Sequence, residues 1–491
     1  MFFNKVRDII FDLFRIDREG FFMIDIVIVI LYLIFALAVG IFAGRNVKTM
    51  KDFSVSSKIF PTSVLVSTIF ATWIGADDLI GVSERVYSVG LSFFVIVLGL
   101  SLSFLFQAYV VAPKIIRGFP NKISIGEIMG DLYGKSGQVT SGIANVLFSV
   151  GFIAMQAKAI GCVCNSFLGI SELAGIIVGS FTIITYSSFG GIRSVVLTDV
   201  LQFGILIIGI PLMASVALEK VGGLEYLMSN LPPQHTELIS YKGSFWLFFA
   251  YFTYCVFPYF SPMLIQRVLM SKDEKQATQS FIISAILYVP FYAMVSLIAL
   301  CATLIFPDVN PNNAFFNVLN YSLPTIVKGI SISGVLAIIM STADSLLNAA
   351  SVAATRDVFA VLWPHKLDDK SELTLSRVVT IIFGLVSVFV ATRFSSMIDF
   401  GLFFSNFWTP AVVAPMFLCL FNLKTDIKTY LIGVAVGFIF IVIFRCSVPE
   451  GYTIVSQMLG ALVTFLTMFV LGKYFGTLNH LYNSDFAVSG V

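Results

Sequence analysis

The chain has 491 residues, of which 58% are hydrophobic and only 12% are charged, and its mean hydropathy is +0.94. A soluble domain contains about 45–50% apolar and about 25% charged residues, so this composition predicts an integral membrane protein. The net charge of +2 gives no reason to expect a nucleic-acid partner, and six cysteines without a CxxC pair indicate neither a metal site nor a disulfide framework.

The chain begins with a segment, residues 1–21, in which Phe3, Val6, Ile10 and Leu13 recur at helical spacing among charged residues. Such an amphipathic pattern is typical of a helix on the membrane surface. Hydrophobic runs long enough to cross a bilayer follow, and we expect an all-α polytopic membrane protein of about 13 transmembrane helices. Their ranges are near 22–44, 60–81, 88–112, 139–164, 171–189, 196–218, 244–265, 279–306, 327–353, 375–392, 398–421, 428–445 and 453–472.

The basic residues of the predicted loops indicate the orientation. The loops after the odd-numbered spans and the C-terminal tail hold about 19 Lys and Arg residues, against about 10 on the other side. The positive-inside rule then predicts a multi-pass protein of the cell membrane with its N-terminus outside. Its C-terminal tail, residues 473–491, is expected in the cytoplasm.

Two of the predicted spans are broken. Span 60–81 runs into TWIGADDLIGVSER, which has two glycines and two carboxylates where a helix should be most apolar, and span 244–265 contains Pro258 and Pro262. Breaks at membrane depth survive only where they line a cavity. Because the breaks lie five spans apart, they predict two inverted repeats of five helices each, a transporter signature. The alternative is two unrelated kinks that serve packing.

These repeats divide the chain into regions. We expect an additional N-terminal transmembrane helix at 22–44, a first inverted repeat at 60–218, a second at 244–421 and two C-terminal transmembrane helices at 428–472.

The stretch from Ile338 to Phe359 is mostly apolar, yet it places Ser341, Thr342 and Asp344 close together within a span. Polar groups inside a bilayer are costly and usually mark an ion or substrate path. On a helix, Ile338 shares one face with Ser341 and Thr342. The alternative is that the hydroxyls only bond their own backbone.

No arrangement of residues suggests catalysis. The nearest match to a phosphate loop, around Gly130 and Gly134, has the wrong glycine spacing and no strand before it. We therefore expect no enzyme and no organic cofactor, and a transport process driven by an ion gradient.

Three stretches carry a resemblance to a known family: DFSVSSKIFPTSVLVSTIFATWIGADDLIG, SSFGGIRSVVLTDVLQ and IIMSTADSLLNAASVAATRDVF, with a smaller match at the QR of LIQRVLMSKDEKQA. The chain resembles the sodium/solute symporters, which include proline, pantothenate, sugar and choline carriers, and it looks most like the choline branch. The resemblance implies the leucine-transporter-type fold with two inverted repeats. It also implies a sodium-coupled secondary active symporter that imports a small organic solute, such as an amino acid, an amine or a carboxylate, by alternating access.

The family's shared sodium site can be carried over by motif. It falls on the backbone carbonyls of Ala71, Ile74 and Ile338 and on the hydroxyls of Ser341 and Thr342. Oxygen ligands of this kind suit a hard cation such as sodium. The expected partners are therefore sodium, the solute and the lipid bilayer.

The same resemblance places Asp199 on the sodium exit path. The alternative for Asp199 is an acid that caps a helix or pairs with nearby Arg193.

The choline branch recognises its solute with an aromatic cage, which attracts a cation through its ring faces. Trp73 fits one wall of such a cage, and Tyr254 and Phe257 of the seventh span are further candidates for solute binding or gating. The alternative for these aromatic residues is packing within the membrane.

Three intramembrane charges complete the candidate solute site. Asp77 and Asp78 favour a solute with an amino or ammonium group over a sugar. Lys158, within span 139–164, is expected near one of the two acids, and Asp78 is the preferred partner. The alternative is that Lys158 extends to the membrane interface.

Two other functions remain open on the sequence. A protein of the same fold can be a sensor or receptor of its solute, although the short tail after the last span leaves no room for a kinase. A carrier of this fold can also be coupled to protons instead of sodium.

Overall fold

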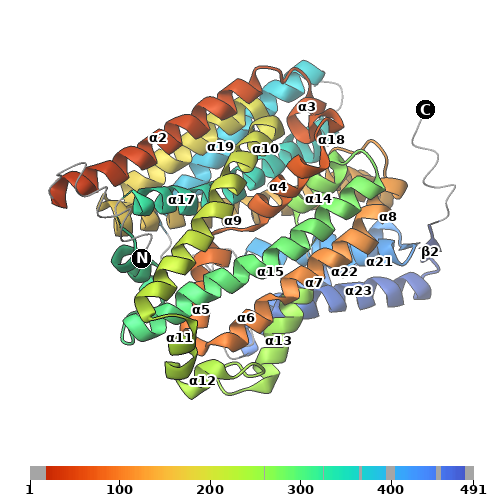
Figure 1. Cartoon of the computed structure of the whole chain (residues 1–491). Helices are drawn as coiled ribbons and strands as arrows, with labels where there is room; N and C mark the ends of the chain where they lie inside the picture. The colour runs from red at the N-terminus through yellow and green to blue at the C-terminus, as the bar shows by residue number, and fades with distance from the viewer. Residues whose placement is uncertain are drawn as a thin grey trace.

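The computed structural model describes residues 18–258, 260–324, 326–363, 368–393, 404–448 and 455–481. The described chain is almost entirely helical, as predicted (Figure 1). Most of the predicted amphipathic segment at 1–21 and the end of the predicted tail at 473–491 lie outside the described residues.

The first part of the chain alternates short and long helices. Its elements are α2 (Arg18–Gly44), α3 (Met50–Val55), η1 (Ser56–Lys58), α4 (Thr62–Trp73), η2 (Asp77–Gly81), α5 (Val82–Val89), α6 (Leu91–Val97), α7 (Gly99–Phe106), η3 (Gln107–Val111), α8 (Ala112–Gly118), α9 (Ile125–Leu168), α10 (Glu172–Val221), α11 (Leu224–Asn230) and α12 (Pro233–Thr236).

The second part repeats the alternation and adds one small sheet. Its elements are α13 (Phe245–Val256), α14 (Pro262–Met270), α15 (Glu274–Ile305), η4 (Pro311–Asn313), α16 (Ala314–Ser322), α17 (Val327–Val352), η5 (Ala353–Phe359), α18 (Ala360–Leu362), α19 (Asp369–Ala391), η6 (Thr409–Val413), α21 (Ala414–Leu420), β1 (Leu423–Lys424), α22 (Ile427–Ser447), α23 (Ser456–Tyr474) and β2 (Asn479–His480). Strands β1 and β2 pair antiparallel, with Leu423 opposite His480.

Within the described residues, nine helices are long and apolar enough to cross a membrane, or ten if the bent pair α4 and η2–α5 is one crossing. The shorter apolar helices Phe245–Val256 and Phe404–Leu420 match two more predicted spans. The count of about 13 helices stays a prediction, as do the boundaries of the repeats.

Helix α10 covers two predicted spans, 171–189 and 196–218, and Gly191 divides it. Gly191 has φ 50° and ψ −139°, a backbone conformation that side chains rarely allow. A Cβ atom there would lie 2.5 Å from the ring of Phe53. The glycine therefore permits both the sharp kink and the close approach of α3.

The two predicted breaks are confirmed. Helices α4 and η2–α5 are bent by 66°, and the chain between them is extended at Ile74. In the second repeat, α13 ends at Val256 and α14 begins at Pro262, where proline is well tolerated because the first helical turn needs no N–H donor.

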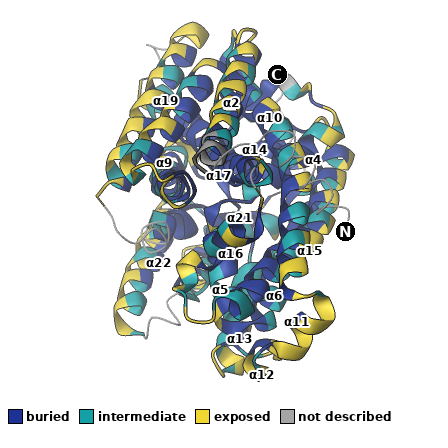
Figure 2. Cartoon of the chain, turned by 60° about the vertical axis from the view of Figure 1, so that its left-hand side comes forward, coloured by how far each residue is buried: buried dark blue, intermediate teal, exposed yellow. Residues whose placement is uncertain are grey.

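Helix α17, which carries the polar stretch, lies at the centre of the molecule. Within the span Val327–Leu362, 94% of an apolar 18-residue segment is buried. Figure 2 shows α17 in dark blue among α2, α9, α10 and α14. Asp25 of α2 accepts the backbone N–H groups of Ile326 and Gly329, at 3.1 and 2.9 Å, at the start of α17. The additional N-terminal helix thus satisfies donors that this helix end would otherwise leave buried and unpaired.

Candidate ion and solute site

The break after α4 exposes backbone groups that a continuous helix would satisfy. The N–H of Gly75 donates to Asp78 Oδ2 at 3.2 Å, and the N–H of Ala76 donates to Gln156 Oε1 of α9 at 3.0 Å. The hydroxyl of Tyr292 in α15 donates to Asp78 Oδ1 at 2.6 Å. Side chains from two other helices therefore hold the break open, and Asp78 serves this backbone as well as the adjacent cavity.

Carbonyl oxygens freed by the break face α17. The hydroxyl of Thr342 lies 2.9 Å from the carbonyl oxygen of Ile74 and 3.1 Å from that of Thr72. Ala71 and Ile338 are both buried, on α4 and α17 respectively, and Ile338 precedes Thr342 by one helical turn. The donor set is entirely oxygen and uncharged, which fits a hard monovalent cation.

Ser341 turns instead toward α10, where its hydroxyl donates to Asp199. Asp199 also accepts from Thr68 of α4 and, at 3.3 Å, from Thr72. The carboxylate predicted for the ion exit path thus contacts one of the predicted ion ligands, Ser341.

A buried arginine, Arg267 of α14, completes this cluster. Its Nη2 lies 3.3 Å from Asp199 Oδ2, 2.7 Å from the hydroxyl of Thr72 and 2.6 Å from that of Ser345. Both members of the ion pair are fully buried. The alternative partner considered for Asp199, Arg193, instead pairs with Asp52 at 2.9 Å.

Asp344 faces a different group of residues from Ser341. It accepts from the hydroxyl of Tyr186 and lies 3.4 Å from that of Thr198, both on α10. Asp344 is therefore not in contact with the carbonyls of the break.

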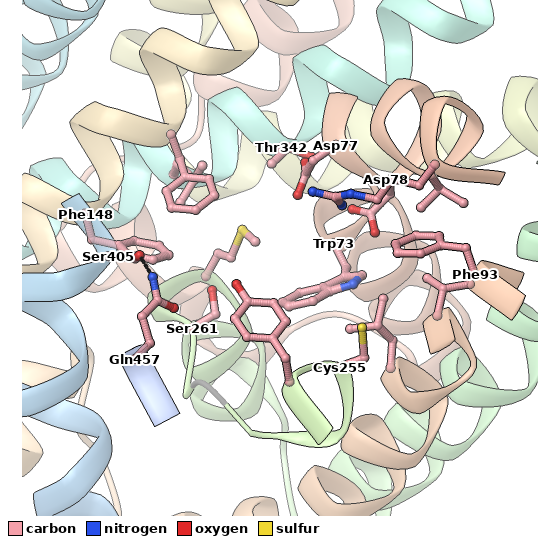
Figure 3. A pocket seen from close by; sticks show the side chains of 18 residues that line it. Trp73, Asp77, Asp78, Phe93, Phe148, Cys255, Ser261, Thr342, Ser405 and Gln457 are labelled. Carbon is pink, nitrogen blue, oxygen red and sulfur yellow. Dashed lines mark hydrogen bonds between the residues drawn. The ribbon is translucent and has the colours of Figure 1, made fainter. Parts of the chain in front are cut away.

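Beside the break lies a cavity of about 170 Å³ (Figure 3). Its lining combines aromatic rings with a few polar and charged side chains, contributed by both repeats. The lining residues are Trp73, Asp77, Asp78, Val82, Arg85, Phe93, Val97, Leu100, Phe148, Phe152, Tyr254, Cys255, Ser261, Met263, Thr342, Leu346, Ser405 and Gln457.

Gly75 is where the ion site and the cavity meet. A Cβ atom built there would lie 2.9 Å from Asp77 Oδ1, 2.9 Å from Gln156 Nε2 and 3.2 Å from Thr342 Oγ1. Polar atoms from η2, α9 and α17 thus converge on a residue without a side chain. Thr342 belongs to both places, since it contacts the Ile74 carbonyl and lines the cavity.

Four of the six residues predicted to bind or gate the solute lie together at the cavity. Trp73, Asp77, Asp78 and Tyr254 all line the cavity, whereas Phe257 does not. Phe257 packs on Phe417, with ring centroids 5.5 Å apart, in a separate apolar pocket. The helix α13 has ended by then, so the extended chain carries Phe257 away from the cavity.

The expected proximity of Lys158 to Asp77 or Asp78 is wrong. Lys158 pairs with Glu172 at the start of α10. The reason is helical phase: Gln156 faces the break, and a residue two positions later lies about 200° further around α9.

Sequence reasoning missed three residues that the structure brings to the site. Gln156 lies two positions before Lys158 in the sequence. It occupies the position at the break where we expected Lys158. Arg267 was noted only as part of a family match, although a basic residue within an apolar stretch is itself a signal. Arg85 was not singled out, because it lies four residues beyond the end of the predicted span 60–81 and reads as a loop residue.

An ion held by the Ile74 carbonyl and the Thr342 hydroxyl would tie the broken helix to α17 directly beside a solute-sized cavity. Such an arrangement couples the binding of two ligands, which defines the class of ion-coupled membrane carriers. The sequence profile of the Sodium:solute symporter family matches residues 53–437, and the chain belongs to this family.

Relatives with different solutes align over nearly the whole chain. The chain is 22% identical to a sodium/pantothenate symporter of Escherichia coli (strain K12), over 91% of this chain and 95% of that protein. It is 23% identical to a sodium/glucose cotransporter of Vibrio parahaemolyticus, over 95% and 92%. It is 27% identical to the high-affinity choline transporter 1 of Drosophila melanogaster, over 82% and 68%.

Solved structures share the fold. A Na⁺-coupled sialic acid symporter in a substrate-bound outward-open state superposes with a TM-score of 0.81 at 18% identity, over 94% of this chain and 99% of that one. Mhp1, a nucleobase-cation-symport-1 family transporter, superposes with a TM-score of 0.54 at 13% identity, over 88% and 98%. The fold is the leucine-transporter type, as predicted, and the protein is a sodium-coupled symporter of small organic solutes rather than an enzyme.

Proposed function

We propose that this symporter binds sodium between the broken first helix and α17. The ligands are the carbonyl oxygens of Ala71, Ile74 and Ile338 and the hydroxyls of Ser341 and Thr342. The observation that carries the proposal is the position of the Thr342 hydroxyl, 2.9 Å from the Ile74 carbonyl and in the wall of the cavity.

Coupling follows from this position. An ion between Ile74 and Thr342 stabilises the arrangement of the break and α17, and the same two segments line the cavity in which the solute binds. Each ligand therefore favours the conformation that the other requires, which is reciprocal coupling. A membrane potential adds about 2.3 kcal/mol per charge per 100 mV, so one inward sodium ion supplies a useful driving force for uptake.

Asp199 takes the role of an exit-path carboxylate in this proposal. It contacts Ser341 on one side and the guanidinium of Arg267 on the other. Sodium that leaves the site past Ser341 meets a carboxylate whose charge is already partly balanced, so it is attracted without being trapped.

The test replaces the two hydroxyl ligands. We expect Ser341→Ala and Thr342→Ala each to raise the sodium concentration for half-maximal thermal stabilisation of the purified protein by about tenfold, and the double variant to raise it further. Potassium chloride keeps the ionic strength constant. Ser333→Ala is the matched control, because Ser333 lies on the same helix and bonds the Gly329 carbonyl of its own backbone at 2.9 Å.

The outcomes also separate the remaining alternatives. Unchanged sodium dependence in the double variant would overturn the site and direct attention to Asp77, Asp78 and Asp199, and to proton coupling. Sodium-dependent counterflow in proteoliposomes separates a carrier from a sensor, because a sensor binds its solute without exchanging it across the bilayer.

We also propose that the N-terminus is outside the cell and that the C-terminus is cytoplasmic. The excess of Lys and Arg in one set of loops supports this orientation.

A further inference from the structure

Two opposite charges lie unpaired in the wall of the cavity. Asp77, in η2, is exposed there, and Arg85, in α5, is half-buried. Among the described residues neither forms an ion pair within 4.0 Å, although Arg85 is close enough to Asp77 to act on it electrostatically. Charges at membrane depth are costly and normally find partners, so the missing partners are expected to come from the bound solute.

Arg85 follows Asp77 by eight residues, on the helix α5 that continues directly from η2. Helical side chains lean toward the N-terminus, so the long Arg85 side chain extends back toward the turn that carries Asp77. The ring of Phe93, 5.3 Å from the guanidinium carbon, holds it by a cation–π contact in place of a carboxylate.

Two neutral donors in the same wall also lack partners. The indole Nε1 of Trp73 and the hydroxyl of Ser261 are buried and make no hydrogen bond, and Ser261 is only 3% exposed. Figure 3 shows both residues at the cavity. A buried donor without an acceptor destabilises the protein. An anionic oxygen of a bound solute would accept these hydrogen bonds and remove that penalty.

The rest of the wall sets the size and the apolar character of the solute. A cavity of about 170 Å³ is close to the roughly 150 Å³ that holds a benzene molecule, so it suits a solute of few heavy atoms. The faces of Trp73, Phe93, Phe148, Phe152 and Tyr254 supply apolar contact. A sugar would leave most of its hydroxyl groups against these rings without partners.

We infer that the solute is a compact zwitterion, with its cationic nitrogen at Asp77 and its carboxylate toward Arg85. Small amino acids and betaines belong to this class. A purely cationic solute would leave Arg85 unpaired beside a second positive charge, and a purely anionic one would lie against Asp77 and Asp78. This inference rests on the proposed function, because it names the solute of the same coupled site.

The test compares matched compounds that differ only in charge. Thermal stabilisation of the purified protein in sodium chloride is measured with L-proline, L-valine, β-alanine and γ-aminobutyrate, each beside its methyl ester and its N-acetyl derivative, and with glycine betaine, choline, acetate and glucose. We expect at least one zwitterion to stabilise the protein. Its ester and its N-acetyl form should bind at least about tenfold more weakly.

Variants then assign each charge. Asp77→Asn should abolish preference for the zwitterion over its N-acetyl form, and Arg85→Gln should abolish preference over its methyl ester. Both variants should keep their stabilisation by sodium alone. Glu225→Gln and Lys220→Gln, which remove exposed charges outside the cavity, should change neither preference.

The results distinguish this inference from the proposed function. Stabilisation by choline, acetate, glucose, a methyl ester or an N-acetyl derivative, without a zwitterion among the best ligands, would overturn the inference. The inference would also be overturned if sodium stabilised the protein normally but no zwitterion bound to it. If sodium did not stabilise the unmodified protein, the proposed ion site would be overturned instead.

Discussion

Arg267 lies fully buried between the two halves of the molecule, and its guanidinium reaches hydroxyls of α4 and α17 as well as Asp199 of α10. Three helices that are far apart in sequence therefore share one cation. A buried ion pair adds little net stability over an apolar core, but removing one partner leaves a buried charge uncompensated. The role of Arg267 follows from that asymmetry.

We predict that Arg267→Gln lowers the free energy of unfolding by about 3–5 kcal/mol, because Asp199 then keeps its charge without a counterion. Arg267→Lys should lose less, since it retains the charge but not the planar fork that reaches several hydroxyls at once. Thermal unfolding of the purified protein without sodium measures both effects.

The control for this prediction is Arg117→Gln. Arg117 pairs with Glu274 at 2.6 Å, but its side chain is 71% exposed. An exposed pair contributes about 0–1 kcal/mol, so this variant should unfold almost like the unmodified protein. Equal unfolding temperatures for the Arg267 and Arg117 variants would contradict a structural role for the buried cation.

At the residue scale, the sequence predicts contacts between residues of the family motifs. It predicts few of the contacts that depend on how a helix is rotated about its axis. Ile74 and Thr342 meet as the family motif implies, because both lie within stretches that carry the family resemblance and whose pairing the fold determines. Gln156, for which the sequence predicts no role, lies at the break where Lys158 was expected, since the rotation of α9 against its neighbours is set by packing across the whole bundle.

The break between α4 and η2 is the element on which both ligand sites depend. Its extended turn frees the carbonyl oxygen of Ile74 for the ion, and its next residues, Asp77 and Asp78, line the cavity. Gly75 stands between these two parts, with polar atoms of η2, α9 and α17 around it. A side chain at this point would separate the groups that coupling requires to be close.

We predict that Gly75→Ala strongly impairs sodium binding, with at least about a tenfold loss of affinity, while the protein still folds. The added Cβ would meet Asp77 Oδ1 and Gln156 Nε2 at 2.9 Å, so these groups must move. Sodium titration of thermal stability provides the measurement.

Gly81→Ala is a closely matched control, because Gly81 ends the π-helical segment η2 that follows Gly75, and its nearest neighbour is Asp77 Cβ at 3.9 Å. An alanine there has room and favours the helix, so sodium affinity should be retained. If both variants bound sodium normally, the crowding around Gly75 would have no functional meaning.

At the element scale, the sequence predicts where helices break better than where they end. Pro262 marks the start of α14, and the glycines and carboxylates of the first break mark its position, because these residues act locally on the backbone. The division of α10 at Gly191 falls between the predicted spans 171–189 and 196–218, but the close approach of Phe53 to this glycine is a tertiary contact that no local pattern reveals.

At the scale of the whole molecule, polar contacts join segments that follow the odd-numbered predicted spans. Arg193 pairs with Asp52, and Arg356 pairs with Glu127 at 2.7 Å, in each case between segments separated by an even number of predicted crossings. Strand β1 pairs with β2 across the two crossings α22 and α23. Segments that touch outside the bilayer lie on the same face, so these contacts support the predicted alternation of the spans. The positive-inside rule predicts that this face is the cytoplasmic one.

That orientation can be tested on a native side chain. Cys446 is the one exposed cysteine of the six, and it lies next to the end of α22, the length of one crossing away from β1. We predict that a membrane-impermeant maleimide labels Cys446 in intact cells and that Cys446→Ser abolishes this labelling. If the C-terminus is cytoplasmic, as proposed, a fluorescent protein fused after Val491 should fluoresce and alkaline phosphatase fused there should be inactive. Labelling of Cys446 only after permeabilisation, together with active phosphatase, would reverse the orientation. Active phosphatase together with labelling in intact cells would mean that α23 does not cross, and the count of about 13 spans would then be wrong.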